Sequence, residues 1–193
     1  MRDFRNISKF RIFDLLISLV ILIVLLPVSL IIFIVCFMES GNPIFTQTRV
    51  GKDKKPFKIY KFRTMKKNTP SLASHLISKK SITKFGKVIR HLKLDELPQI
   101  INVIKGDMSL IGPRPCLYNQ EELIYFRTKY KVFNFLPGIT GLAQIKQIDM
   151  SEPEKLAITD DKMNKNLNLI NYFKLLFLTF FGKGFGDKVF RKN

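Results

Sequence analysis

Residues 90–115 read Arg-His-Leu-Lys-Leu-Asp-Glu-Leu-Pro-Gln-Ile-Ile-Asn-Val-Ile-Lys-Gly-Asp-Met-Ser-Leu-Ile-Gly-Pro-Arg-Pro. Apolar residues recur at helical spacing on both sides of two adjacent acids, Asp95 and Glu96. They are Ile82, Phe85, Ile89 and Leu92 before the acids, and Leu97, Ile100, Ile101 and Ile104 after them. The acids therefore mark a joint between two amphipathic helices. Because proline is tolerated only in a first helical turn, Pro98 predicts that the second helix begins at about residues 95–97, and Lys105-Gly106 predicts its end.

The charges around this joint predict a site for phosphate. Asp95 would lie at a helix N-terminus, where the helix dipole favours an ionised carboxylate, and a capping role alone would explain a single acid. Two adjacent acids are unfavourable unless cations neutralise them, and Arg90, Lys93 and Arg114 are the candidates. Arg114 also lies between two prolines, which stiffen the turn and present one guanidinium fork, a group suited to phosphate.

The N-terminal region predicts a membrane segment. Leu15 to Met38 carries no charge, and a helix of this length would reach about 36 Å, enough for a bilayer core of roughly 30 Å. Basic residues flank both ends, so their distribution gives no orientation. Pro27 lies in the middle and can kink a helix. The residues leave two arrangements open: a kinked spanning helix, or a re-entrant hairpin whose ends return to one membrane face.

Composition limits the function only broadly. The chain of 193 residues is long enough for one soluble domain, or for a smaller domain with a membrane element. Its net charge of +18 fits nucleic acid, anionic lipid or phosphorylated substrates equally well. Cys36 lies within the apolar segment and Cys116 beside the Pro-Arg-Pro turn, so free thiols and a cytoplasmic compartment are expected.

The remaining patterns predict a mixed α/β fold, a compact membrane-associated domain with a small β-hairpin and amphipathic helices. Ile44 to Val50 and Phe57 to Met65 are strand-like and flank a turn, which predicts a hairpin. Lys61 and Arg63 would share one face of its second strand. Near the C-terminus, the apolar block of residues 172–181 is too short to span a bilayer, so it forms a core helix or lies in the membrane interface, which its basic neighbours favour.

Four motifs are similar to those of a known family. They are Tyr60-Lys61-Phe62-Arg63-Thr64-Met65, Leu94-Asp95-Glu96-Leu97-Pro98-Gln99, the run of residues 105–115, and Pro137-Gly138-Ile139-Thr140-Gly141. The chain resembles the bacterial sugar transferases, the monotopic phosphoglycosyl transferases. The resemblance implies a re-entrant membrane helix over residues 1–40, broken at Pro27, and a catalytic domain over residues 41–193 with a C-terminal interface helix. That domain would lie on the cytoplasmic face of the inner membrane.

The resemblance also implies the reaction. A sugar 1-phosphate would pass from a UDP-sugar to undecaprenyl phosphate, giving a polyprenyl diphosphate sugar and UMP in the first membrane step of capsule, O-antigen or glycoprotein synthesis. Asp95 would form a covalent aspartyl phosphosugar, although direct displacement is an alternative. Glu96 would position the metal or the lipid phosphate, and Asp95 and Glu96 would bind Mg²⁺. Lys61, Arg90 and Arg114 would bind substrate phosphate.

A second function class is a non-enzymatic, membrane-anchored basic module that binds anionic lipid or nucleic acid. The net charge and the apolar anchor of the chain would suffice for that role. They would not explain why two acids lie within the most basic part of the chain. No nucleic-acid partner is expected, because the glycines of an RNA-recognition strand are absent. The chain also departs from the family pattern near Gln147, where relatives carry an arginine, so the sequence does not identify the sugar.

Overall fold

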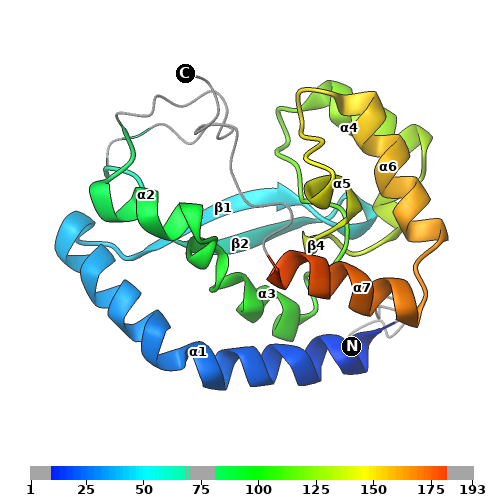
Figure 1. The fold of residues 1–193 in the computed structure, drawn as a ribbon. Helices are drawn as coiled ribbons and strands as arrows, with labels where there is room; N and C mark the ends of the chain where they lie inside the picture. Colours follow the sequence, from blue (N-terminus) through cyan, green and yellow to red (C-terminus); the bar gives the residue numbers. More distant parts are fainter. Residues whose placement is uncertain (1–9, 68, 70–80, 182–193) are drawn as a thin grey trace.

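The computed structural model describes residues 10–67, 69 and 81–181. The helices and strands, with η marking a 3₁₀ helix, are α1 (Arg11–Ser40), β1 (Ile44–Val50), η2 (Lys52–Lys54), β2 (Pro56–Phe62), α2 (Lys84–His91), η5 (Leu94–Glu96), α3 (Gln99–Lys105), β3 (Ser109–Ile111), α4 (Glu121–Lys129), η6 (Val132–Asn134), β4 (Gly138–Thr140), α5 (Leu142–Ile145), α6 (Pro153–Lys165) and α7 (Leu169–Phe180). Figure 1 shows α1 along the base, the β1–β2 hairpin across the middle, and α4, α5 and α6 grouped together. The expected mixed α/β fold is confirmed.

The predicted hairpin is confirmed as well. β1 and β2 pair antiparallel, from Ile44 opposite Phe62 to Val50 opposite Pro56. The second strand ends three residues before its predicted end at Met65. The reason is that the chain leaves β1 there and turns toward the segment ahead of α2, where Met65 forms a bridge with Ile82. Arg63 therefore lies beyond the strand, and only Lys61 of the predicted basic pair lies within it.

The joint between two helices is confirmed, but Asp95 lies differently from the prediction. The second helix, α3, begins at Gln99 with Pro98 as its N-cap, and it ends at Gly106, whose φ of 88° is a left-handed stop. Asp95 and Glu96 lie before it in the separate turn η5. Their turn forms because the N–H groups of Glu96 and the next residue bond back to carbonyls three residues earlier. Asp95 is thus not at the N-terminus of an α-helix.

A short parallel pair, β3 and β4, places the Pro-Arg-Pro turn. The backbones come so close that a Cβ on Gly138 would lie 2.0 Å from the nitrogen of Gly112, which only glycine at both positions permits. The N–H of Gly112 donates to Thr140 and the N–H of Gly138 donates to Pro113. The start of the turn at residues 112–115 is therefore fixed to the next motif along the chain.

The apolar N-terminal segment forms one continuous helix of 30 residues, long and apolar enough to cross a membrane. Pro27 lies inside it, so the structure contains one helix and not two helices joined at the proline. Figure 1 shows that α1 bends, with its first half under α3 and α7 and its second half rising toward α2. Proline removes one helical hydrogen bond and favours such a bend.

Both ends of α1 pack against the rest of the chain, while its middle is exposed. At the start, Phe10 and Ile17 join a cluster with Ile111 and Tyr172. At the other end, Ile32 and Cys36 are buried in a cluster with side chains of β2, α2, η5 and the residue after η5, namely Phe62, Ile89, Leu94 and Leu97. Between these contacts lies a long run of exposed apolar side chains, including Ile23, Val24, Leu26, Leu30 and Ile31.

A buried carboxylate attaches the first half of α1 to the domain. One oxygen of Asp14 accepts hydrogen bonds from the Ser109 hydroxyl at 3.0 Å, the Leu110 N–H at 3.0 Å and the Tyr172 hydroxyl at 2.7 Å. Burial and this hydrogen bond raise the pKa of Tyr172, so its hydroxyl stays a donor. Asp14 therefore joins α1 to both β3 and α7.

Replacing Asp14 with Ala is expected to lower the free energy of unfolding by about 3 kcal/mol, because three buried donors lose their acceptor. Tyr172→Phe removes only one of these donors and should cost about 1 kcal/mol. Thermal unfolding in detergent or nanodiscs measures both. Equal melting temperatures for the native chain and the Asp14→Ala variant would contradict a stabilising role for this contact.

α7 confirms the predicted C-terminal helix. Tyr172 and Leu175 are buried on one face, whereas Ile170, Phe177 and Phe180 are exposed. The same helix is linked to β4 by a hydrogen bond between the hydroxyls of Thr140 and Thr179. An apolar face of α7 therefore remains exposed on a helix that Figure 1 draws next to the first half of α1.

Candidate functional site

The centre of the candidate site is Glu96, which binds two cations at once. Its Oε1 lies 2.7 Å from Nζ of Lys61 and 2.6 Å from Nη2 of Arg114. A second nitrogen of Arg114 reaches Oε2 at 3.4 Å, so the guanidinium approaches the carboxylate as a fork. The structure thus joins three predicted site residues that lie far apart in the sequence.

Asp95 is next to Glu96 in η5, and each residue is only 8% exposed. Lys93, just before the turn, has a φ of 56°, which is uncommon for a residue with a side chain and sets the direction of η5. Arg90 lies in the last turn of α2, which packs on η5, and its Nη1 donates to Thr64 Oγ1 at 3.4 Å. The structure therefore places Arg90 beside the turn that carries both acids.

The two cations keep Glu96 ionised. Burial alone would raise the pKa of Glu96, but the Arg114 guanidinium and the Lys61 ammonium hold it well below its usual value of 4.5. A carboxyl whose pKa is depressed by folding stabilises the fold above its unfolded pKa, and this contribution is lost as the pH falls through the folded pKa.

We therefore expect Glu96→Gln to lower the free energy of unfolding by about 2 kcal/mol near neutral pH, since two cations lose a charged partner. The difference from the native chain should be constant between about pH 8 and about pH 6, and should shrink only below the usual pKa of 4.5. Melting temperatures of the native chain and the variant, measured from about pH 8 to below pH 4.5, give this difference. The matched control is Glu122→Gln, at an exposed residue. If the stability difference between Glu96→Gln and the native chain already decreased near pH 6, the depressed pKa of Glu96 would be contradicted.

An asparagine outside the predicted site residues fixes the backbone of β2 next to Lys61. Asn102 is buried in α3, and its amide receives the N–H of Tyr60 at 3.1 Å and donates to the carbonyl of Lys58 at 2.7 Å. The side chain thus imitates a neighbouring strand along the edge of β2. Its signal in the sequence was one polar residue within an apolar helical face.

The turn that carries Arg114 is held by two further arginines that the sequence analysis missed. Nη1 of Arg127 donates to the carbonyl of Arg114 at 2.8 Å, and Nη1 of Arg49 donates to that of Pro115 at 3.2 Å. Burial and the nearby Arg114 lower the pKa of Arg49 to about 10, so it remains charged at neutral pH. Arg127 lies four residues after the buried Leu123, and an arginine on an apolar helix face was the available signal.

The donor set fits Mg²⁺ only together with a substrate. Among residues 10–67, 69 and 81–181, no three His, Cys, Asp or Glu side chains gather as a metal site. Mg²⁺ is commonly held by one or two carboxylates, with water and phosphate oxygens completing its shell, and Asp95 and Glu96 supply such a pair. Glu96 already binds Lys61 and Arg114, so a metal ion would share it with these cations.

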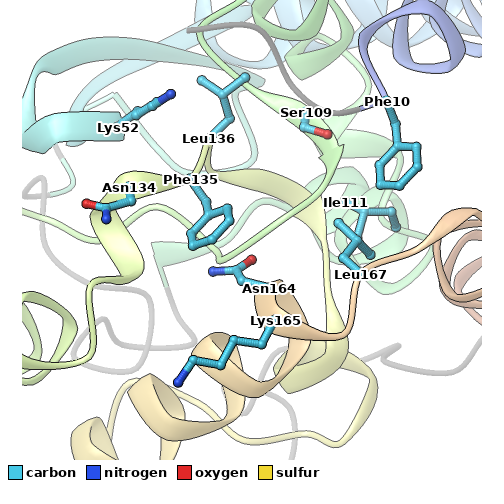
Figure 2. A pocket seen from close by; sticks show the side chains of 10 residues that line it. All are labelled: Phe10, Lys52, Ser109, Ile111, Asn134, Phe135, Leu136, Asn164, Lys165 and Leu167. Carbon is cyan, nitrogen blue, oxygen red and sulfur yellow. The ribbon is translucent and has the colours of Figure 1, made fainter. Parts of the chain in front are cut away.

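A separate pocket of about 320 Å³ lies away from these residues. Figure 2 shows Phe10, Ile111 and Leu167 on one side and Asn134, Phe135 and Asn164 on the other. Among the described residues that line it, the charged ones are Lys52 and Lys165, and none is a carboxylate. The pocket therefore has a different chemistry from the site at Glu96, to which none of its lining residues belongs.

The sequence is similar to that of known proteins along most of its length. The profile of a family described as "Bacterial sugar transferase" matches residues 5–184. The uncharacterized sugar transferase EpsL of Bacillus subtilis is 38% identical over 170 residues, covering 88% of this chain and 84% of the relative. A putative undecaprenyl-phosphate N-acetylgalactosaminyl 1-phosphate transferase of the same organism is 40% identical over 139 residues, covering 70% and 73%. A UDP-glucose:undecaprenyl-phosphate glucose-1-phosphate transferase of Escherichia coli is 37% identical over 189 residues, covering 91% of this chain but 40% of that longer protein.

Proposed function

Because the chain belongs to the bacterial sugar transferase family, we propose that it moves a sugar 1-phosphate from a UDP-sugar to undecaprenyl phosphate. The products are a polyprenyl diphosphate sugar and UMP, in the first membrane step of glycoconjugate synthesis. The observation that supports this most directly is the charge arrangement at η5, where two adjacent acids meet a lysine and a forked arginine. A module that only bound anionic lipid would gain nothing from acids at this point.

In the proposed reaction, a carboxylate oxygen of Asp95 attacks the β-phosphorus of the UDP-sugar. The bond from that phosphorus to the bridging oxygen breaks, and UMP leaves with the electron pair. An oxygen of undecaprenyl phosphate then attacks the same phosphorus and releases the Asp95 carboxylate. Two displacements at one phosphorus thus give the diphosphate product and regenerate the enzyme.

Lys61 and Arg114 already bind the carboxylate of Glu96, so the phosphate of a bound substrate would replace part of the negative charge that Glu96 presents to them. Arg90 is buried in α2, which packs on η5, and adds further positive charge near the acids. Asp95 and Glu96 are the residues that would hold Mg²⁺, which when bound would neutralise charge on the donor diphosphate. The three cationic side chains, together with the metal ion when bound, would offset the negative charge of the transferring phosphoryl group.

The experiment that tests the function measures UMP release with a panel of UDP-sugars, each with and without undecaprenyl phosphate. We expect one or a few sugars to give UMP that depends on the enzyme. Donor labelled in its β-phosphate and incubated without acceptor should leave label on the protein if the covalent route holds. Label and UMP that appear only after lipid is added would indicate direct displacement, and no UMP with any donor would favour the binding module.

We also propose that α1 enters the cytoplasmic leaflet of the inner membrane and returns to the same face. Two findings support this placement: both ends of α1 pack on the same domain, and the side chains between them are apolar and exposed. A straight crossing would pull one of these ends away from its contacts. The exposed apolar face of α7 would lie in the interface beside it.

The placement predicts that single cysteines at Arg5 and Lys54, in a chain whose two native cysteines are replaced, both resist a membrane-impermeant maleimide applied to intact cells. Both should react in inside-out vesicles, which is the positive control. Arg5 lies outside the described residues, so this arm tests the expectation from the sequence. Labelling of one position alone from outside the cell would show a spanning helix and contradict the proposal.

A further inference from the structure

A buried ion pair joins two helices on the far side of the Pro-Arg-Pro turn. Nη2 of Arg127, in α4, lies 2.7 Å from Oδ2 of Asp160, in α6, and the side chains are 2% and 1% exposed. Removing two charges from water is costly, and such pairs often contribute less to stability than apolar residues of the same size. The pair therefore points to a role beyond holding α4 to α6, which the other contacts of Arg127 identify.

Arg127 also contacts the turn that carries Arg114. Arg127 uses its other terminal nitrogen to donate to the carbonyl of Arg114 at 2.8 Å, while the bond to Asp160 fixes the plane of its guanidinium. The same side chain lies against the thiol of Cys116, which is fully buried. Arg127 thus touches two residues of the segment that presents the Arg114 fork.

The turn depends on such side chains because its own backbone offers few donors. Pro113 and Pro115 have no N–H group, and the carbonyls of Arg114 and Pro115 both accept from arginine side chains. The fork of Arg114 in turn lies within 2.6 Å of Glu96. A shift of about 1 Å in a group that binds phosphate is enough to cost substantial rate.

We propose that Arg127 and Asp160 are positioning residues: Asp160 orients Arg127, and Arg127 holds the carbonyl of Arg114 so that its guanidinium points at the η5 acids. This inference rests on the proposed function for its effect on rate, but not for its effect on structure. The link from this pair to the site is the bond from Arg127 to the backbone carbonyl of Arg114, so the pair acts through the backbone of the turn.

The test replaces the pair with apolar residues of similar size, in the double variant Arg127→Met with Asp160→Leu. Removing both charges leaves no unpaired buried ion, so the melting temperature should stay close to that of the native chain. kcat/KM for the UDP-sugar is expected to fall about tenfold, because the Arg114 turn loses a donor. The matched control is Lys165→Met with Asp161→Leu, an ion pair in the same helix whose side chains are 72% and 17% exposed, which should change kcat/KM less than twofold.

A readout specific to positioning comes from repeating the double variant in an Arg114→Lys background. If the pair acts through Arg114, the tenfold loss should shrink to less than about twofold there, because coupled residues are not additive. The same loss in both backgrounds, or no loss in the native one, would overturn the proposal. Should the double variant fail to fold, Arg127→Lys, which keeps the charge but cannot bridge both partners, takes its place with the same expected outcomes.

Hydrogen exchange separates this inference from the proposed function. The amides of residue 114 and of residues 116–118 should exchange faster in the double variant than in the native chain, whether or not the protein turns over any UDP-sugar. Unchanged exchange in a folded double variant would overturn the positioning role. If the double variant exchanges faster than the native chain, but the native chain releases no UMP with any donor, the positioning role is supported and the transferase function is refuted.

Discussion

Asp95→Asn is expected to lower UMP release by about 10³-fold or more, because the amide cannot act as the nucleophile that accepts the phosphosugar. The substitution keeps the size and shape of the side chain in η5. Membrane association should be unchanged, since α1 packs on the domain through other residues. Steady-state UMP release and trapping of label from the β-phosphate of the donor measure the effect.

The control for Asp95→Asn is Asp53→Asn, an exposed residue in the hairpin turn with a φ of 52°, which asparagine adopts readily. It should retain full activity. An Asp95→Asn variant that still releases UMP at a substantial fraction of the native rate, after deamidation back to Asp has been ruled out by mass spectrometry, would refute the covalent route. Asp95 would then serve only the metal ion or the charge of the site.

Arg114→Gln is expected to lower kcat/KM for the UDP-sugar by about 10²-fold, because the donor loses a two-pronged, charge-assisted contact in a partly dry site. Arg114→Lys should recover only part of the loss, since an ammonium restores the charge but not the fork. Initial rates over a range of donor concentrations measure both variants.

The surface variant Lys155→Gln controls for a general loss of positive charge, since Lys155 forms an exposed ion pair with Glu152 at the start of α6. It should leave the rate unchanged. If Arg114→Lys were as active as the native chain, charge alone would account for the role of Arg114. The forked contact to Glu96 would then be a feature of the unliganded site only.

The sequence predicted those parts of the fold that depend on local periodicity. The β1–β2 hairpin, the helices around residues 95 and 96, and the helix of residues 172–181 were all expected from apolar spacing and turn residues. It also selected Lys61 and Arg114, which the structure brings to Glu96. Their selection rested on motifs similar to those of a known family. Spacing alone would not have paired a strand residue with a turn more than fifty residues later.

The missed features are contacts between segments far apart in the chain. Asp14 and Tyr172 meet although they are 158 residues apart, and Arg127 meets Asp160 across two helices. A single sequence has no local signal for such pairs. At Pro27 the residues alone left a kinked helix and a re-entrant hairpin open, and the structure has one helix that bends. A proline inside a long apolar helix costs only part of its hydrogen bonding, so the helix continues past it.

The contact between the end of α1 and η5 has a consequence for how the enzyme meets its lipid. Ile32 and Cys36 of α1 pack against Leu94 and Leu97, the residues on either side of the two acids. In the proposed membrane placement, the apolar helix therefore fixes the height of Asp95 and Glu96 above the acyl chains. The acceptor would reach the nucleophile by diffusing within the plane of the leaflet, with its phosphate at the depth where lipid headgroups already lie. Detaching α1 from the domain would thus change the height of the two acids relative to the lipid phosphates, as well as release the domain from the membrane.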